Sequence, residues 1–350
     1  MAKVSQRVLI VLFGALGDVT RALPLAVRLK RSWPECHLTW AVEPKSREIL
    51  QLHPAVDRVI VFERGRGFAG YVDFVKQMRC EPYDVVLDLQ RHLKSGVTSW
   101  LSQSSKRIGF HRRNAKEFNW IFNSATIPEY PQLMQKLDHY QKFGDYLGLQ
   151  TMEQLEFGIE PSVEISLRAE QLIAEGALAR GLDALPAARR AILILGSTWP
   201  TKFWSVENFS ELARELFLRR GILPLAVGAS SERAFLDQMY RLDPALPVVD
   251  LVGKTSLAEL IGVLAAARFA VGTDSGPMHL AAALKKPVIS LWGPTSPLRS
   301  APYNNESLLL QSPLGCSPCY SRSCPGLDRL CMRSIPAEAV LARVSQILDV

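Results

Sequence analysis

The sequence predicts an α/β protein made of two doubly wound domains. Short apolar runs, typical of strands buried on both faces of a parallel sheet, alternate with amphipathic helical stretches. This alternation stops after residue 147 and resumes at residue 191. A chain of 350 residues is also too long for one ordinary hydrophobic core. We therefore expect two domains of similar size, each with its ligand-binding loops at the carboxyl ends of its strands.

The first series begins with the apolar run Arg7 to Phe13, which the tight turn Gly14-Ala-Leu-Gly-Asp18 follows. Pro34 ends the next helix because proline disfavours helical geometry in the residue before it. The predicted strands are 7–13, 37–42, 58–62, 84–89 and 106–110, and the predicted helices are 20–33, 46–52, 71–78, 95–101 and 133–147.

The second series follows a mixed stretch in which Gly181 and Pro186 indicate a linker. Its predicted strands are 191–195, 222–227, 248–251, 268–271, 287–292 and 308–311, and its predicted helices are 206–218, 231–241, 257–267, 279–284 and 336–348. The expected boundaries are 1–160 for the first domain, 161–188 for the linker, 189–335 for the second domain and 336–350 for a terminal helix.

Composition limits the class of protein and its location. The content of 48% hydrophobic and 21% charged residues is that of a globular chain. No apolar run reaches the roughly 20 residues that span a bilayer, and the first residues show no signal-peptide cleavage site. We therefore expect a cytoplasmic protein. The net charge of +7 favours anionic partners, but no nucleic-acid-binding module is present.

The stretch Gly272-Thr-Asp-Ser-Gly-Pro-Met-His279 is the strongest candidate for a binding site. It runs from a strand end through a turn into a short helix, whose free N–H groups and dipole favour phosphate. The Ser275 hydroxyl adds a donor, and His279 faces the same space. The alternative is an ordinary turn in which Asp274 or Ser275 caps the helix and His279 is packed away.

Three further loops follow predicted strands. Asp18 is placed to act as a general base on a hydroxyl, or to cap the next helix. Ser197, Thr198 and Lys202 suit a diphosphate, unless Trp199 and Trp204 merely anchor a surface loop.

Glu232 follows another predicted strand. Its carboxylate can accept hydrogen bonds from ribose hydroxyls, although a solvent-exposed Glu at a helix start is the commoner case.

Basic residues gather after strands of the first domain. The cluster is compatible with a solvated basic face or with a site for a multiply anionic acceptor. Arg64 and Arg66 lie in one of these loops, and Arg113 and Lys116 lie in another.

Four cysteines lie close together near the end of the chain, at Cys316, Cys319, Cys324 and Cys331. In a cytosolic protein such a group favours a metal over disulfides. The spacing is irregular for a zinc ribbon. A structural zinc, a pair of disulfides and four free thiols therefore all remain open.

These motifs together resemble the bacterial heptosyltransferases of lipopolysaccharide core synthesis, glycosyltransferase family 9. The resemblance rests on Gly17-Asp18, on Lys202-Phe-Trp, and above all on Asp274-Ser-Gly-Pro-Met-His followed by Trp292-Gly-Pro-Thr-Ser-Pro. It implies a GT-B fold, in which two Rossmann-like domains face each other across a cleft. It also implies a metal-independent, inverting transfer of heptose from ADP-L-glycero-β-D-manno-heptose to a core acceptor.

Carried over to this sequence, the resemblance assigns a role to each motif. Asp18 is the general base and Lys202 stabilises the leaving diphosphate. The remaining donor-binding residues are Ser197, Thr198, Glu232, Asp274, Ser275, Gly276 and His279. The resemblance also implies that the acceptor binds to Arg64, Arg66, Arg113 and Lys116. The implied partners are a nucleotide sugar and an anionic lipid-linked oligosaccharide at the cytoplasmic face of the inner membrane, with no cofactor needed for catalysis.

Several alternatives stay open at this point. The chain could use another nucleotide sugar or another glycan acceptor, or it could bind a nucleotide sugar without catalysis. Intact Asp18 and Lys202 argue against a mere binder. The missing G-x-G-x-x-G fingerprint argues against a nicotinamide-dependent oxidoreductase.

Overall fold

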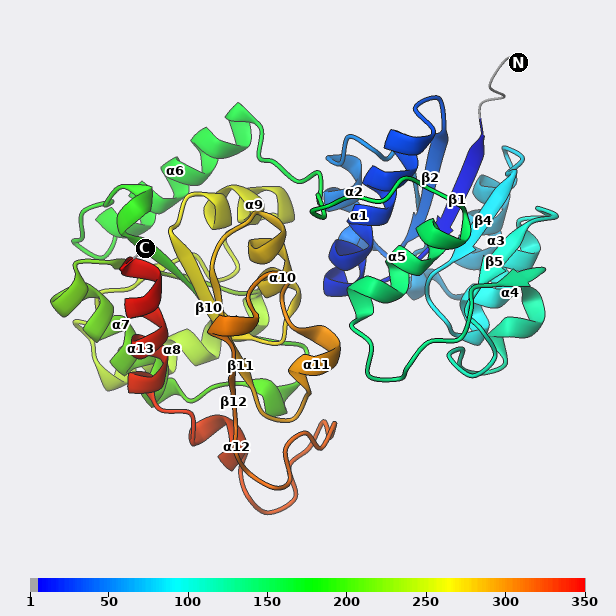
Figure 1. Cartoon of the computed structure of the whole chain (residues 1–350). Helices are drawn as coiled ribbons and strands as arrows, with labels where there is room; N and C mark the ends of the chain where they lie inside the picture. Colours follow the sequence, from blue (N-terminus) through cyan, green and yellow to red (C-terminus); the bar gives the residue numbers. More distant parts are fainter. Residues whose placement is uncertain (1–5, 350) are drawn as a thin grey trace. The chain divides into compact units, whose positions relative to one another are not determined.

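The computed structural model describes residues 6–349, which form two compact units divided between Ile159 and Glu160 (Figure 1). Residues 1–5, at the start of the predicted first domain and of the stretch without a signal-peptide cleavage site, and residue 350, at the end of the predicted terminal segment, lie outside the described residues.

The first unit contains one parallel sheet and five α-helices among its described residues. Its strands are β1 (Arg7–Val11), β2 (His37–Val42), β3 (Arg58–Val61), β4 (Val85–Asp88), β5 (Arg107–Gly109) and β6 (Ala125–Thr126). Its α-helices are α1 (Leu16–Ser32), α2 (Arg47–Gln51), α3 (Gly67–Met78), α4 (Leu93–Leu101) and α5 (Lys136–Tyr146). Its 3-10 helices are η1 (Pro44–Ser46), η2 (Arg64–Arg66) and η3 (Asn119–Phe122).

The second unit repeats this plan. Its strands are β7 (Arg190–Ile194), β8 (Leu223–Val227), β9 (Val249–Asp250), β10 (Phe269–Thr273), β11 (Val288–Trp292) and β12 (Leu310–Gln311). Its α-helices are α6 (Val163–Leu178), α7 (Val206–Arg220), α8 (Arg233–Leu242), α9 (Leu257–Ala265), α10 (Gly276–Ala283), α11 (Pro297–Ser300), α12 (Leu330–Arg333) and α13 (Ala337–Leu348). Its 3-10 helices are η4 (Ala187–Arg189), η5 (Pro200–Lys202), η6 (Ser230–Glu232) and η7 (Glu306–Leu308).

Both sheets have the same doubly wound order, which confirms the predicted fold class. The orders are β3-β2-β1-β4-β5-β6 and β12-β11-β10-β7-β8-β9, and every pair is parallel. The direction of winding reverses between β1 and β4 and again between β7 and β10. Ligands of such sheets bind beside the strand ends at this reversal, where the flanking loops diverge. The loops after these four strands are therefore the places for a site.

The apolar runs are strands because they are covered on both faces. Residues of β1, β7 and β10 are almost fully buried, as continuous runs in parallel sheets must be. In the second unit the terminal helix α13 belongs to the same core, through Val340, Val344 and Ile347. It lies beside α7 (Figure 1).

The range expected as a linker, 161–188, contains the helix α6. It packs against α9 so closely that a Cβ at Gly262 would lie 2.9 Å from that of Ala169. The stretch therefore belongs to the second unit from Glu160 onward. The polar-apolar helix pattern was visible in the sequence, but its apolar partner on α9 was not.

Several element boundaries differ from those expected. Helix α1 begins at Leu16 and not at residue 20, α3 begins at Gly67, and the short strand β6 was not predicted. Among the described residues no helix is long and apolar enough to cross a membrane.

Candidate functional site

The loop between β10 and α10 leaves a buried hydroxyl without a partner. Ser275 is the N-cap residue of α10, and Gly276 is the first residue of the helix. The Oγ atom of Ser275 is buried and has no hydrogen-bond partner among the described residues. Leaving such a group unpaired costs about 1–3 kcal/mol. This hydroxyl and the free N–H groups of the first helical turn together suit an anionic ligand.

A buried ion pair joins this loop to the loop after β7. The Nζ atom of Lys202 lies 2.7 Å from Oδ2 of Asp274 and 3.3 Å from its main-chain oxygen. The Oγ atom of Ser197 donates to the same oxygen at 3.0 Å. The Lys202 and Asp274 side chains are only 11% and 14% exposed. The structure therefore brings together four predicted residues at the reversal between β7 and β10.

The environment of Asp274 keeps it ionised. Burial by itself would raise the pKa of this carboxyl, but His279 and Lys202 outweigh burial and hold the pKa well below its usual range. The Nε2 atom of His279 lies 3.8 Å from Oδ1, on the first turns of α10. Asp274 thus braces the turn and neutralises the lysine, and the next residue, Ser275, is the N-cap of α10.

Glu232, which follows the neighbouring strand β8, lies against Gly196 in the loop after β7. Its Oε2 accepts from the Ala229 N–H at 2.6 Å, and its Oε1 accepts from the Ser231 hydroxyl at 2.6 Å. A Cβ at Gly196 would lie 2.2 Å from Cγ of Glu232, so only glycine permits this approach. Thr198 is exposed on the loop that carries Lys202.

Asp18 lies in the first turn of α1 and not at its cap. The N-cap position belongs to Ala15, so the helix-cap interpretation of Asp18 is wrong. The Nζ atom of Lys136, at the start of α5, lies 3.0 Å from Oδ1 of Asp18, and Nη2 of Arg21 lies 3.5 Å from it. The carboxylate is 21% exposed and is held between two cations.

Gln90, which follows β4, fixes the loop that leads to Asp18. Its Oε1 accepts from the N–H groups of Phe13 at 2.8 Å and Gly14 at 3.3 Å. Its Nε2 donates to the Gly14 oxygen at 3.1 Å. These bonds join the ends of β1 and β4, the two strands at the reversal of the first sheet.

The fully buried carboxylate of Asp88 holds Gln90 by a hydrogen bond. Asp88 ends β4, and its Oδ1 accepts from the Gln90 N–H at 3.1 Å. Its Oδ2 accepts from Nδ2 of Asn119 at 2.6 Å. Burial raises the pKa of Asp88 to about 6, although hydrogen bonds from Asn119 and Ser95 partly offset the effect.

The four predicted acceptor residues are exposed and follow strands that lie on both sides of β1. Arg64 and Arg66 form η2 after β3, whereas Arg113 and Lys116 follow β5. Each of these strands is two positions from β1, or roughly 10 Å. Arg66 is paired with Asp73 at 2.9 Å and Arg113 with Glu129 at 3.1 Å.

The structural zinc is not supported. Among residues 6–349 no group of three or more His, Cys, Asp or Glu side chains could hold a metal ion. The four clustered cysteines are free thiols, so the disulfide alternative is not formed either. The segment is anchored without a crosslink: Thr201 Oγ1 donates to the Ser321 oxygen at 2.8 Å, and the Arg322 guanidinium lies 5.1 Å from the Trp199 ring centre.

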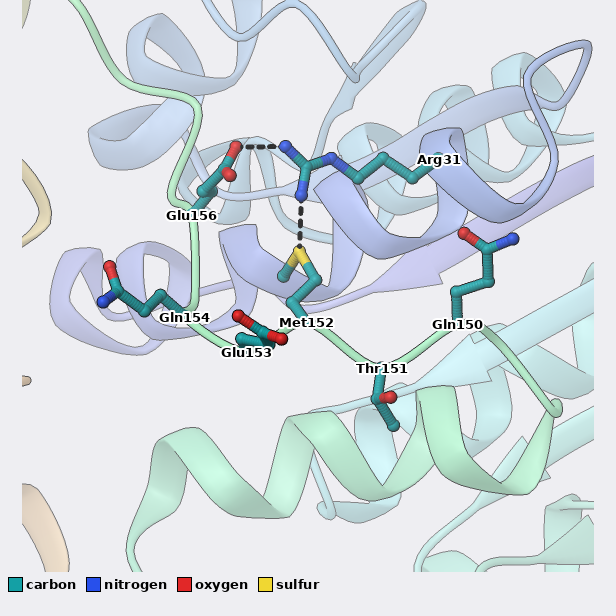
Figure 2. Close-up of a pocket in the computed structure, with 7 residues that line it drawn as sticks. All are labelled: Arg31, Gln150, Thr151, Met152, Glu153, Gln154 and Glu156. Carbon is teal, nitrogen blue, oxygen red and sulfur yellow. Dashed lines mark hydrogen bonds and ion pairs between the residues drawn. The ribbon is translucent and has the colours of Figure 1, made fainter.

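An open hollow of about 410 Å³ lies elsewhere in the first unit, and no predicted site residue lines it. Figure 2 shows the Arg31 guanidinium between Glu156 and the sulfur of Met152, with Glu153 nearby. Two carboxylates and one cation give this hollow no net attraction for an anion.

The residues that contact the predicted site residues could not be predicted from the sequence. Lys136 lies 118 positions from Asp18, and Gln90 lies 76 positions from Gly14. Only the position of Gln90 directly after a predicted strand could have indicated a role, because strand ends meet at one edge of the sheet.

The family model and the curated relatives that match this chain belong to one family. The model of glycosyltransferase family 9 (heptosyltransferase) matches residues 71–328. Lipopolysaccharide heptosyltransferase 1 of Pseudomonas aeruginosa is 31% identical over 331 residues, which cover 91% of this chain and 87% of that protein.

Two solved structures have the same fold along the whole chain. A family 9 glycosyl transferase from Veillonella parvula has a TM-score of 0.81 at 19% identity, covering 99% of this chain and 98% of that one. The E. coli heptosyltransferase WaaC, solved with ADP-2-deoxy-2-fluoro heptose, has a TM-score of 0.72 at 25% identity, covering 97% and 99%.

The buried ion pair makes a prediction about stability. Lys202→Met leaves the Asp274 carboxylate buried without its lysine, and we expect the free energy of unfolding to fall by about 3 kcal/mol. The double variant Lys202→Met/Asp274→Asn should recover most of this loss, because no uncompensated charge remains. Urea denaturation of the three proteins measures both effects.

Lys254→Met is the matched control for this experiment. Lys254 pairs with Asp250 at 2.8 Å in the same unit, but its side chain is 47% exposed. Its loss should cost less than about 1 kcal/mol. Equal losses at Lys202 and Lys254 would contradict a tightly coupled pair in the site.

Asp88 makes a prediction about pH. Its pKa of about 6 in the folded protein exceeds the ordinary value of 3.8, so the stability it contributes is present below pH 3.8 and is lost as the pH rises through 6. Between pH 4 and pH 7.5 the wild type should therefore lose about 2 kcal/mol relative to Asp88→Asn. Urea denaturation at both pH values measures this difference, and parallel behaviour of the two proteins would contradict it.

Proposed function

Because this chain belongs to glycosyltransferase family 9, the heptosyltransferase family, we propose that it transfers heptose from ADP-L-glycero-β-D-manno-heptose to a lipopolysaccharide core acceptor. We propose that the transfer inverts the anomeric carbon and uses no catalytic metal. Support comes from the relative in Pseudomonas aeruginosa, a lipopolysaccharide heptosyltransferase, and from the E. coli enzyme solved with an ADP-heptose analogue.

The observation that carries the proposal is the unpaired Ser275 hydroxyl at the start of α10. It lies one residue from Asp274, which Lys202 contacts at 2.7 Å. A diphosphate at this helix end would accept from the hydroxyl and from the N–H of Gly276, and it would lie beside the lysine. Ser197 and Thr198 would extend the same contacts.

Glu232 would bind the ribose. Its carboxylate already accepts two hydrogen bonds, yet carboxylate oxygens have about four acceptor sites. Two acceptors therefore remain for ribose hydroxyls.

Asp18 would act as the general base. Its carboxylate takes the proton of the acceptor hydroxyl while that oxygen forms a bond to the anomeric carbon. Lys136 and Arg21 hold the carboxylate in one orientation, and the Gln90 hydrogen bonds fix the preceding turn. These four residues would thus define where the acceptor hydroxyl must lie.

The bond from the anomeric carbon to the diphosphate breaks as the new bond forms. ADP leaves with the electron pair, and negative charge grows on its terminal phosphate. Lys202 and the N-terminus of α10 stabilise this charge, an interaction that strengthens in the transition state and so accelerates the reaction.

The acceptor would be an anionic, lipid-linked oligosaccharide. Arg64, Arg66, Arg113 and Lys116 would receive its acidic groups. We further propose that the protein is cytoplasmic and works as a peripheral protein at the inner face of the inner membrane.

Asp18→Asn separates chemistry from donor binding. The amide cannot take the proton, so we expect transfer to fall by at least about 100-fold, whereas the Kd for ADP measured by calorimetry stays unchanged. Asp57→Asn is the control, since Asp57 is also an ion-paired carboxylate of the first unit, 2.7 Å from Lys30. Equal loss of transfer and of ADP binding in Asp18→Asn would remove the base role.

A panel of nucleotide sugars tests the donor. We expect ADP-heptose and ADP to raise the melting temperature of the protein more than UDP- or GDP-sugars do, because ligand binding stabilises the folded state. A thermal-shift series measures this directly. A preference for a UDP-sugar would overturn the heptose assignment and leave the family intact.

A further inference from the structure

Helix α4 has its polarity reversed with respect to an ordinary surface helix. Its buried residues are Ser95, Gly96, Thr98 and Ser99. The opposite face carries Leu93 and Trp100, which are 46% and 55% exposed, and the partly buried Val97 between them. The spacing i, i+4, i+7 places these three apolar side chains on one stripe. A helix normally buries its apolar stripe, so this stripe calls for a partner.

A second apolar segment adjoins α4. Phe118, Trp120 and Ile121, in and just before η3, are 71%, 40% and 59% exposed. Helix α4 and η3 pack directly together: a Cβ at Gly96 would lie 2.9 Å from the Phe122 ring. We call these two segments, Leu93, Val97, Trp100, Phe118, Trp120 and Ile121, the aromatic surface; α4 marks its place in Figure 1.

The exposed aromatic residues are held firmly. Asn119, which lies between Phe118 and Trp120, is fully buried, and its Nδ2 lies 2.6 Å from Asp88 Oδ2 and 2.8 Å from the His92 oxygen. Because hydrogen bonds hold the Asn119 side chain in the interior, the side chains of Phe118 and Trp120 are directed outward. Their exposure is thus a property of the fold.

The segment that carries the aromatic surface is rich in basic residues, of which Lys94 and Arg113 pair with Glu43 and Glu129. Residues 91–125 contain seven Lys and Arg residues and one acidic residue, Glu117, which gives 7 − 1 = +6. The whole chain carries only +7. The basic residues are Arg91, Lys94, Lys106, Arg107, Arg112, Arg113 and Lys116.

We propose that the aromatic surface docks on an anionic lipid bilayer. Exposed Trp, Phe and Leu insert at the boundary between headgroups and acyl chains, while surrounding Lys and Arg bind anionic headgroups. A second copy of the chain fits less well, since it would bring two segments of charge +6 together. The inference deepens the proposed function and rests on it, because a lipid-linked acceptor lies in a membrane.

Vesicle flotation with the full chain tests the surface. Wild-type protein should float with vesicles of phosphatidylcholine and phosphatidylglycerol, and much less with phosphatidylcholine alone. The variant Phe118→Ser/Trp120→Ser/Ile121→Ser should bind the anionic vesicles more weakly by on the order of 10-fold or more. Phe118→Ser alone, at the most exposed position, should weaken binding in the same direction if the triple variant fails to fold.

Leu178→Ser/Leu218→Ser is the matched control. These leucines are 80% and 69% exposed, in the second unit, and their loss should leave flotation unchanged. Wild-type flotation by both the triple and the Phe118→Ser variants would overturn the proposal. So would a wild-type dimer that the Phe118→Ser variant dissociates, since the surface would then bind a second copy.

The assay requires neither donor nor acceptor, so it separates the two proposals. Flotation without any transfer from ADP-heptose would remove the proposed function and leave the docking surface. Transfer to a soluble acceptor without flotation would remove the docking surface alone.

Discussion

One buried ion pair, between Lys202 and Asp274, joins the two loops of the second unit that form its candidate site. It joins the loops after β7 and β10, the two strands between which the sheet reverses its winding. Lys202 binds the Asp274 side chain, and Ser197 donates to the main-chain oxygen of Asp274. The next residue, Ser275, is the N-cap of α10, and its hydroxyl is unpaired. The same carboxylate pairs with the nearly buried lysine, so that no uncompensated charge is left in the loop.

In the first unit, too, a carboxylate near the reversal of the sheet is held by cations. Asp18 follows β1, and cations on α1 and α5 hold its carboxylate. Gln90 after β4 fixes the turn before it. In both units the reversal of the sheet supplies two diverging loops, and side chains join them: Gln90 bonds to the loop after β1, and Lys202 pairs with Asp274.

Much of the fold could be predicted from the sequence, because buried parallel strands are continuous apolar runs and the loops after them are where ligands bind. The same logic predicted Asp18, Lys202 and Ser275 as site residues, and the structure places them in the segments that follow β1, β7 and β10. Contacts between distant positions could not be found this way: nothing local in the sequence joins Lys136 to Asp18 or Gln90 to Gly14. The sequence predicts a linker where helix α6 lies, because its partner α9 is far along the chain. The reversed polarity of α4 was invisible until the buried face was known.

The central claim is that the start of α10 binds the donor's diphosphate, and a structure of the protein with ADP tests it most directly. We expect a phosphate oxygen within hydrogen-bond distance of Ser275 Oγ and the Gly276 N–H, with Lys202 Nζ beside the phosphate. ADP bound elsewhere, for example in the hollow beside Arg31, with the Ser275 hydroxyl still unpaired, would contradict the account.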